Sequence, residues 1–313
     1  MQADAETWHA LDETGRNRIV EQAAEALRGG DLVISPTETV YGVLAHAGSV
    51  SALDTLRSAA RRAGVEPFPG PRFTWHAPDV DAVRGSIDLP TAVHRRLIEK
   101  MLPGPVRFVL EQDAGAIDRA IRSLGIARGV IDDGRRVALR VSSHPIAGEV
   151  IRRAGVPVVA ERLGVTRWGD QDHPDQAPGD VGSFPGVVID VGPLPARGPS
   201  ATVRLARSGA FEVEPGGSIS EKDVMEALKK RILFVCTGNT CRSPMAEAIA
   251  RLLVADLRVH DGVEVVFESA GVATGEGMPA SDEAVRVIEQ MGGDLRGHRS
   301  RRLTASMAER ADR

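Results

Sequence analysis

Cysteine is scarce in this sequence: its 313 residues include only two, Cys236 and Cys241. A disulfide between residues so close in the chain would constrain little of it, so a framework of structural disulfides is excluded. A reversible bridge that protects one of the two from overoxidation stays open as a hypothesis.

Long apolar runs are missing as well, and the longest is far too short for a helix that crosses a bilayer. Residues 1–13 are acidic and lack the basic and apolar regions of a secretory signal peptide. These absences predict a soluble, cytoplasmic protein with no membrane partner.

A strong excess of charge of one sign is also absent, since 39 basic and 43 acidic residues give a formal net charge of −4. Bulk electrostatics therefore favours neither nucleic acid nor an anionic membrane as a partner. The histidines show no metal-ligand spacing, and the Gly-, Pro- and Asp-rich residues 164–199 are expected to form a solvated surface loop. No metal site is predicted.

One short stretch carries the clearest chemical signal. The large apolar residues 232–235 predict a buried parallel strand, which leads into a tight loop from Cys236 to Arg242. Pro244 suits the first turn of a following helix. Backbone N–H groups and a helix N-terminus converge in such a loop, form an anion site and stabilise a thiolate. Arg242 offers a planar fork to phosphate oxygens and Ser243 a hydrogen bond to the sulfur, which predicts thiolate attack on a phosphate ester or phosphoramidate.

With its strand before it and Pro-Met-Ala-Glu after it, the segment Cys-Thr-Gly-Asn-Thr-Cys-Arg-Ser resembles the low-molecular-weight protein tyrosine phosphatases. More narrowly, it resembles their protein arginine phosphatase branch. The resemblance implies that Cys236 is the nucleophile, that Arg242 binds phosphate, that Ser243 supports the thiolate, and that no cofactor is needed. It implies that Asn239 braces the loop and that Thr240 favours phosphoarginine, with phosphotyrosine left open. The implied phosphate-binding set is Thr237, Gly238, Asn239, Thr240 and Cys241.

The N-terminal part opens with an amphipathic pattern. Residues 16–27 predict a helix that ends at Gly29 and Gly30, and residues 31–35 predict a strand. The segment Pro-Thr-Glu-Thr-Val-Tyr-Gly-Val follows at residues 36–43. From its residues alone, this segment is interpreted as a turn and a helix start capped by Glu38 and Thr39.

The same segment resembles the signature of the YrdC family, which makes threonylcarbamoyl-adenylate from threonine, bicarbonate and ATP for transfer RNA modification. Pro-Gly-Pro at residues 103–105, a strand at 136–141 and Ser-Ala-Thr at 200–202 continue the resemblance, which covers about residues 14–220. It implies a synthase that takes ATP with magnesium, L-threonine and bicarbonate, and transfer RNA or another RNA as a partner. The implied substrate-binding residues are Thr37, Glu38, Thr39, Tyr41, Arg61, Arg62, Arg140, Ser200 and Thr202.

The sequence departs from the family pattern at three places. Arg61 and Arg62 stand where the family has a Lys-x-Arg pair for ATP phosphates and the threonine carboxylate. After Ala160, Glu161 begins a segment that replaces Ser-x-Asn, and a carboxylate facing a triphosphate would weaken its binding. Near residue 214, Glu-Pro-Gly replaces Arg-x-Gly. These changes predict reduced, altered or lost synthesis, and they support an alternative: a non-catalytic module that binds nucleotide or RNA.

Beyond the phosphate loop, residues 263–272 predict a second strand and residues 279–291 an amphipathic helix whose buried face carries Ala284, Val287, Ile288 and Met291. A further helix is expected from Thr304. The phosphatase family continues with more strands and with a loop whose aspartic acid protonates the leaving group. The sequence is therefore expected to be a piece of a longer chain, with at most feeble turnover from these residues alone.

The expected fold is α/β overall. A YrdC-like α+β domain with a mixed, twisted sheet is assigned to residues 1–220, a linker helix to 221–230, and an incomplete Rossmann-like phosphatase unit to 231–313. The predicted function combines a threonylcarbamoyl-adenylate synthase-like domain with a cysteine-dependent phosphatase for phosphorylated proteins. A third hypothesis, in which both domains are inert scaffolds, would require the phosphate-loop pattern to be a coincidence.

Overall fold

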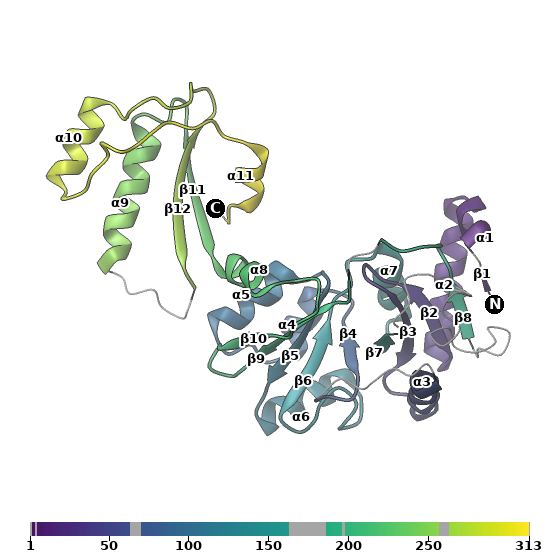
Figure 1. The fold of residues 1–313 in the computed structure, drawn as a ribbon. Helices are drawn as coiled ribbons and strands as arrows, with labels where there is room; N and C mark the ends of the chain where they lie inside the picture. Colours follow the sequence, from purple (N-terminus) through teal and green to yellow (C-terminus); the bar gives the residue numbers. More distant parts are fainter. Residues whose placement is uncertain are drawn as a thin grey trace. The chain divides into compact units, whose positions relative to one another are not determined.

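The computed structural model describes residues 2–3, 5–62, 70–162, 186–195, 198–256 and 263–312. It divides into two compact units, Met1–Val224 and Met225–Arg313, each of which is considered by itself (Figure 1). The division falls inside helix α8 (Glu221–Leu228). Within the described ranges, no helix is both long enough and apolar enough to cross a membrane.

Unit 1 is built on a mixed ten-stranded sheet. Its strands lie in the order β1 (Gln2–Ala3), β8 (Gly186–Ile189), β2 (Leu32–Pro36), β3 (Tyr41–His46), β7 (Val158–Arg162), β4 (Thr74–His76), β6 (Arg136–Arg140), β5 (Val106–Glu111), β9 (Ala201–Leu205) and β10 (Phe211–Val213). Neighbours are parallel in the pairs β1–β8, β8–β2, β4–β6 and β5–β9, and antiparallel elsewhere. The predicted mixed sheet is confirmed.

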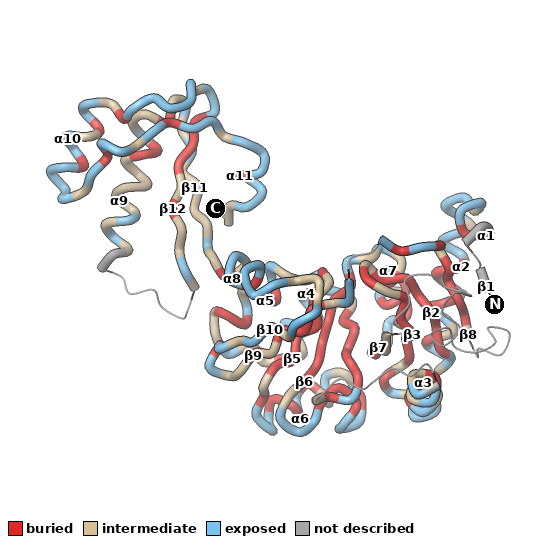
Figure 2. The backbone as a smooth tube through the Cα atoms, in the orientation of Figure 1, coloured by how far each residue is buried: buried red, intermediate tan, exposed pale blue. Residues whose placement is uncertain are grey.

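The described helices of this unit are α1 (Ala5–Ala10), α2 (Glu13–Gly29), α3 (Val50–Arg62), α4 (Val80–Ser86), α5 (Ala92–Met101), α6 (Ala114–Leu124) and α7 (Pro145–Ala154). Buried residues concentrate in the strands (Figure 2). One apolar cluster joins α2 and α7 to side chains of β2, β3, β7 and β8, including Leu44, Val158 and Ala160. This cluster covers part of one sheet face and leaves the neighbouring part of that face for a cavity.

Helix α2 follows its sequence signals closely. The carboxylate of Asp12 accepts a hydrogen bond from the Gly15 N–H at 2.7 Å and caps the first turn. Gly30 ends the helix with a φ of 89°, a left-handed conformation that glycine adopts without steric cost. The predicted helix is confirmed, and it begins three residues earlier than the apolar pattern alone indicated.

The segment after β2 is a hairpin and not a helix start, so the interpretation from its residues alone is wrong. Strand β3 runs antiparallel to β2, with Tyr41 opposite Pro36. The Thr37 N–H donates to the Val40 carbonyl at 3.2 Å, and the Thr37 hydroxyl donates to the same oxygen at 2.6 Å. Because β3 also pairs with β7, ladder hydrogen bonds on both edges override the local capping signals.

Strand β8 corrects a second expectation. Residues 164–199 were predicted to be a surface loop, yet residues 186–189 form a strand that pairs with both β1 and β2. The apolar run Gly-Val-Val-Ile was not recognised as a strand, because it is short and is surrounded by Gly, Pro and Asp. Residues 190–195 and 198–199 of the predicted loop belong to no helix or strand, and residues 164–185 and 196–197 lie outside the described residues.

Unit 2 contains β11 (Lys230–Cys236), α9 (Arg242–Asp256), β12 (Val265–Gly271), α10 (Asp282–Gln290) and α11 (Ala305–Arg310). Strands β11 and β12 are parallel over seven residue pairs and connect through α9, as the sequence predicted. Helices α9 and α11 flank the strand pair on opposite sides (Figure 1). Thr304 caps α11 by accepting a hydrogen bond from the Met307 N–H.

The strand before the phosphate loop is less buried than expected. No residue of β11 is buried, and Val235 is 46% exposed. Within the described residues β11 pairs with β12 alone, so the strand has one neighbour instead of two. Helix α10 also buries a narrower stripe than predicted: Ala284 and Ile288 are fully buried, whereas Val287 and Met291 are 44% and 50% exposed.

Candidate active sites

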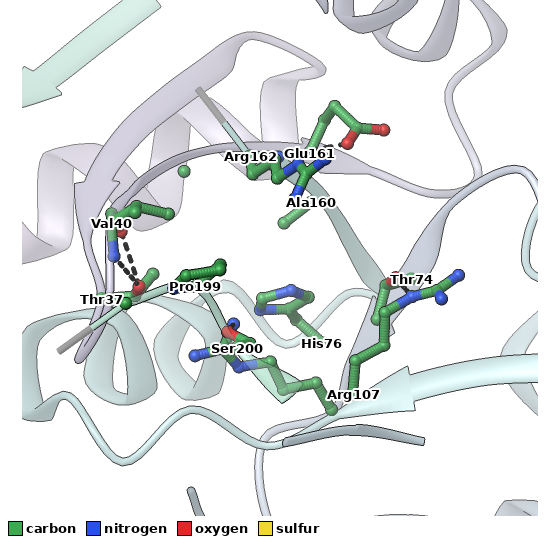
Figure 3. Close-up of a pocket in the computed structure, with 13 residues that line it drawn as sticks. Thr37, Val40, Thr74, His76, Arg107, Ala160, Glu161, Arg162, Pro199 and Ser200 are labelled. Atoms are coloured by element: carbon green, nitrogen blue, oxygen red, sulfur yellow. Dashed lines mark hydrogen bonds between the residues drawn. The ribbon is translucent and has the colours of Figure 1, made fainter. Parts of the chain in front are cut away.

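A cavity of about 350 Å³ opens on the sheet of unit 1 (Figure 3). It lies over β3, β4, β5, β6 and β7, with the segment before β9 on one side. The lining residues are Thr37, Val40, Gly42, Thr74, His76, Arg107, Arg140, Ala160, Glu161, Arg162, Gly198, Pro199 and Ser200. Strand register brings most of them together, because Thr74 lies opposite Ala160 and His76 opposite Arg140, so their side chains share one face.

A buried ion pair lies beside this cavity. Arg140 Nη2 is 2.8 Å from Glu38 Oε1, and both side chains are 8% exposed. The Ser142 hydroxyl donates to Glu38 Oε2 at 2.6 Å, and Arg140 Nη1 donates to the Ser200 hydroxyl at 2.5 Å. Burial raises the pKa of Glu38, but the charge of Arg140 and the bond from Ser142 outweigh it and lower that pKa to about 2. The pair is therefore fully ionised at neutral pH.

Hydroxyl groups extend the network around this pair. The Thr39 hydroxyl lies 3.1 Å from that of Ser200 and 3.3 Å from that of Thr37. Thr202 is buried on β9, two residues after Ser200. The structure thus gathers six of the nine residues predicted to bind substrate: Thr37, Glu38, Thr39, Arg140, Ser200 and Thr202.

The other three lie elsewhere. Tyr41 is fully buried; its hydroxyl donates to Asp190 Oδ1 at 3.0 Å and lies 2.8 Å from the Gly192 carbonyl oxygen. Burial raises the pKa of Tyr41, so this phenol stays neutral and braces β3. Arg61 is exposed on α3 and is not among the residues that line the cavity. The side chain of Arg62 lies outside the described residues.

Glu161 is among the residues that line the cavity, and the expectation that its carboxylate weakens the binding of a triphosphate stays a prediction. Successive side chains of β7 alternate between the two faces of the sheet, so Ala160 and Arg162 share one face. Figure 3 shows the Glu161 side chain turned away from His76 and Ser200. Burial raises the pKa of Glu161. This segment therefore brings one acidic and one basic residue, Glu161 and Arg162, to the lining of the cavity.

Three cavity residues were missed from the sequence: Thr74, His76 and Arg107. The first two alternate along β4, a three-residue strand that is too short to give a periodic signal. His76 is buried, and burial with the nearby charge of Arg140 lowers its pKa to about 3, so it is neutral at physiological pH. Arg107 lies on β5 just after the Pro-Gly-Pro segment, which contributes to the family resemblance but does not point to the residues that follow it.

The second site is the phosphate loop of unit 2. Cys236 ends β11, and α9 begins at Arg242. The Cys236 sulfur lies 2.9 Å from the Ser243 hydroxyl and accepts a hydrogen bond from the Asn239 N–H at 3.2 Å. Partial burial raises the pKa of Cys236, but hydrogen bonds from Ser243 and from backbone N–H groups of the loop outweigh it and lower the pKa. The geometry favours a thiolate.

Asn239 holds the loop in shape. It is fully buried and has a φ of 49°, a left-handed conformation that asparagine tolerates better than most residues. Its side-chain amide donates to the hydroxyls of Ser243 at 2.9 Å and Ser269 at 3.0 Å. Its side-chain oxygen accepts from the Arg301 N–H at 2.9 Å, and its carbonyl lies 2.7 Å from His298 Nε2. Sequence reasoning missed Ser269 and His298, which act through Asn239.

The remaining loop residues take different positions. Arg242 is exposed and donates to the Thr237 hydroxyl at 3.2 Å. Gly238 and Thr240 are half-buried, and the Thr240 carbonyl accepts from the Ser281 N–H at the start of α10. Cys241 packs against the apolar cluster of α10 and is unpaired, as is Cys236. Its side chain is therefore a packing group in this structure.

Replacing Ser243 with alanine is expected to raise the pKa of Cys236. The variant loses the hydroxyl that stabilises the thiolate, and a hydrogen bond to a charged group contributes about 1.5 kcal/mol or more, roughly a tenfold change in thiolate population. Alkylation of Cys236 by iodoacetamide at pH 7, followed by peptide mass spectrometry, should slow by about that factor. Cys241 in the same digest is the internal control, and equal slowing of both cysteines would contradict the prediction.

No group of three or more histidine, cysteine or acidic side chains suited to a metal ion occurs in the part of the chain that the structure describes.

Fold and sites together define a two-domain α/β protein, with a buried ligand cavity in one domain and a cysteine-dependent phosphate loop in the other. The family model of the Sua5, YciO and YrdC proteins, described as Telomere recombination, matches residues 25–213. The chain belongs to this family. The model described as Low molecular weight phosphotyrosine protein phosphatase matches residues 231–313. The chain thus joins a threonylcarbamoyl-AMP synthase-like domain to a segment that is similar to part of the low-molecular-weight phosphatases.

Individual relatives agree with this assignment. A Mycobacterium tuberculosis protein named provisionally as a threonylcarbamoyl-AMP synthase is 29% identical over 71% of this chain and 95% of its own length. The protein-arginine-phosphatase of Geobacillus stearothermophilus is 49% identical over 23% of this chain and 44% of its own. The chain spans about half the length of the curated phosphatases that it matches.

A solved structure shows the likeness in fold. Sua5 from P. abyssi, complexed with L-threonine, aligns with a TM-score of 0.50 at 17% identity, over 87% of this chain and 85% of that one. Synthases of this family use ATP, and low-molecular-weight phosphatases need no cofactor.

Proposed function

We propose that the chain combines two activities: a protein phosphatase in residues 231–313 and threonylcarbamoyl-adenylate synthesis in residues 1–220, with residues 221–230 as a linker helix. The observation that carries the phosphatase proposal is the contact of the Cys236 sulfur with the Ser243 hydroxyl and the Asn239 N–H. Three groups that favour the thiolate form meet at one atom: a hydroxyl, a loop amide and the N-terminus of α9.

The proposed phosphatase reaction has two steps. The Cys236 thiolate attacks phosphorus, the bond from phosphorus to the substrate oxygen or nitrogen breaks, the leaving atom takes a proton from solvent water, and a phosphocysteine forms. Water then attacks phosphorus, gives up a proton to solvent, and releases phosphate with the thiolate. Arg242 and the loop N–H groups bind the equatorial oxygens, where charge accumulates during both transfers. Ser243 stabilises the thiolate as it leaves in the second step.

We infer phosphoarginine as the preferred group in a phosphorylated protein, with phosphotyrosine as the second candidate. Thr240 and the similarity to a protein-arginine-phosphatase support this choice. Both substrates are presented as peptides of one sequence, and phosphate release is measured. Faster release from phosphotyrosine would reverse the preference and leave the cysteine mechanism intact.

The synthase-like proposal rests on the cavity of unit 1. Arg140, Ser200 and Thr39 offer a cation and hydroxyls beside the cavity, and the related Sua5 structure was solved with L-threonine. We propose that this site takes ATP, L-threonine and bicarbonate, with magnesium entering on the ATP phosphates. The second candidate is a non-catalytic module that binds nucleotide or RNA, transfer RNA included. Arg61 favours this candidate, because it stands where the family has its phosphate-binding Lys-x-Arg pair but is exposed on α3 and does not line the cavity.

Pyrophosphate release decides between the two. The purified chain with ATP and magnesium is expected to release pyrophosphate only when threonine and bicarbonate are both present. Omission of either substrate is the control. Retained ATP binding without release would leave the binding module as the function of unit 1.

A thiolate nucleophile that must stay reduced suits the cytoplasm, which keeps thiols reduced, and we propose this location.

A further inference from the structure

A groove of about 400 Å³ opens on unit 2 beside the phosphate loop. Helix α9 forms one side of it, and the segment 293–298, which follows α10, forms the other. Pro244, in the first turn of α9, lines the groove and stands two residues after Arg242. The groove therefore begins next to the residue that is proposed to bind the phosphate group.

His298 connects the groove to the phosphate loop. It lines the groove, and its Nε2 lies 2.7 Å from the Asn239 carbonyl oxygen. A carbonyl oxygen can only accept, so Nε2 carries a proton, and the neutral form of the ring keeps Nδ1 as an acceptor. The Asn239 N–H in turn donates to the Cys236 sulfur at 3.2 Å. Two residues, His298 and Asn239, thus link the groove to the nucleophile through hydrogen bonds.

Apolar side chains form much of the lining. Ala248 and Leu252 are four residues apart on α9 and so lie on one side of the helix, and Leu295 lies on the opposite wall of the groove. Leu295 is buried and belongs to the apolar cluster against which Ala248 packs. Such walls suit a hydrocarbon chain, because contact with them removes methylene groups from water.

The charged groups of the lining are two acids, Glu247 and Asp294, and one arginine, Arg251. Glu247 Oε1 accepts a hydrogen bond from Arg251 Nη2 at 2.7 Å, so these two charges balance each other. Asp294 Oδ1 accepts from the Arg296 N–H at 2.8 Å, but the side chain of Arg296 pairs with a glutamate of α10. Asp294 has no ion pair among the described residues. It therefore leaves a negative charge in the groove without a counter-charge.

We propose that this groove binds the side chain of an arginine or lysine that lies near the phosphorylated residue of the protein substrate. Such a side chain lays its methylene groups along the apolar walls and brings its charged end to Asp294. Its N–H groups can also donate to Nδ1 of His298. A few residues of an extended peptide, at about 3.3 Å each, span the distance from the loop to a groove that begins at Pro244. The inference rests on the proposed phosphatase function and narrows its substrate class.

Fluorescence anisotropy with labelled peptides tests the proposal on the full chain carrying Cys236→Ser, which is expected to bind a phosphate group without turnover. One uncharged peptide sequence carries phosphotyrosine, and arginine replaces glutamine at single positions about two to five residues away on either side. At least one arginine peptide is expected to bind about threefold more tightly, or better, than the glutamine peptide, as for a partly exposed ion pair.

Asp294→Asn should abolish this gain in affinity, because it removes the charge and keeps an oxygen for the Arg296 N–H. Asp282→Asn is the matched control. It removes the same charge from unit 2, at the exposed start of α10 and outside the lining of the groove, and should leave the gain unchanged.

Equal affinity for the arginine and glutamine peptides would overturn the proposal and leave the phosphatase function intact. A gain that survives Asp294→Asn, or that Asp282→Asn abolishes as well, would also overturn it, because the attraction would then not depend on the groove. The unphosphorylated peptide is the reference for the phosphate loop itself. Binding that is the same with and without the phosphate group would refute the proposed phosphatase function together with the inference.

Discussion

Replacing Cys236 with serine is expected to abolish phosphatase activity. The loop lowers the pKa of the Cys236 thiol and so favours its nucleophilic thiolate form. A serine hydroxyl at this position is not ionised at neutral pH and is therefore a much weaker nucleophile. Removal of a nucleophile costs up to about 10⁶ in an efficient hydrolase. With phosphoarginine and phosphotyrosine peptides we expect a loss of at least about a thousandfold in kcat, measured as phosphate release, with Arg242 still able to bind the phosphate group.

Cys241→Ser is the matched control for that experiment. It lies in the same loop, but its side chain packs against the cluster of Ala284 and Ile288 on α10. Its activity should stay within a few-fold of the wild type, since a small polar group replaces a packing group. An active Cys236→Ser variant would remove the covalent mechanism. An inactive Cys241→Ser variant with an intact fold would show that the second sulfur takes part.

Replacing Arg140 with methionine is expected to destabilise unit 1 by about 3 kcal/mol or more at pH 7. The change leaves the Glu38 carboxylate buried without its counter-charge, and breaking a buried pair in this way costs about 3–5 kcal/mol. Urea unfolding followed by tryptophan fluorescence isolates this unit, because all three tryptophans of the chain lie within residues 1–224. Arg136→Met is the control: its pair with Asp133 is partly exposed, and a loss under about 1 kcal/mol is expected.

The pH dependence of that difference has a definite sign. The pKa of Glu38 is about 2 in the folded protein and near 4.5 when the chain is unfolded. The pair therefore contributes its full stability above pH 4.5 and loses it as pH falls toward 2. The gap between wild type and Arg140→Met should narrow as the solution is acidified below about pH 4.5. A gap that stays constant from pH 7 to pH 3 would show that packing, and not charge, sets the loss.

Local sequence signals were sufficient to predict the structure where the residues that determine the conformation lie within the segment itself. Gly30 ends α2 in a left-handed conformation as the sequence predicted, and the phosphate loop follows from its strand, its helix start and its cysteine. Local sequence signals failed where pairing with a strand far away in the sequence determines the conformation. Residues 36–43 became a hairpin because β7 pairs with β3, and Val235 stays half-exposed because β11 pairs with β12 alone.

The two sites differ in the same way, because one is formed by neighbouring residues and the other by distant segments. The phosphate-loop residues are contiguous, so their spacing alone brings Cys236 and Ser243 together. The cavity of unit 1 is assembled from strands far apart in sequence, and only strand register shows that His76 and Arg140 lie side by side on its face. Thr74 and His76 carry no signal of their own, since a three-residue strand between longer elements has too few residues for a period to be recognised.

The ten-stranded sheet ends in very short strands, β1 with two residues and β10 with three. Unpaired backbone groups at a sheet edge are templates for another chain, and a short edge offers few of them. Unit 1 therefore presents little surface for edge-to-edge aggregation even at high concentration, which suits a domain whose wide sheet would otherwise be prone to it. Its long strands lie in the interior of the sheet, where both edges are already paired.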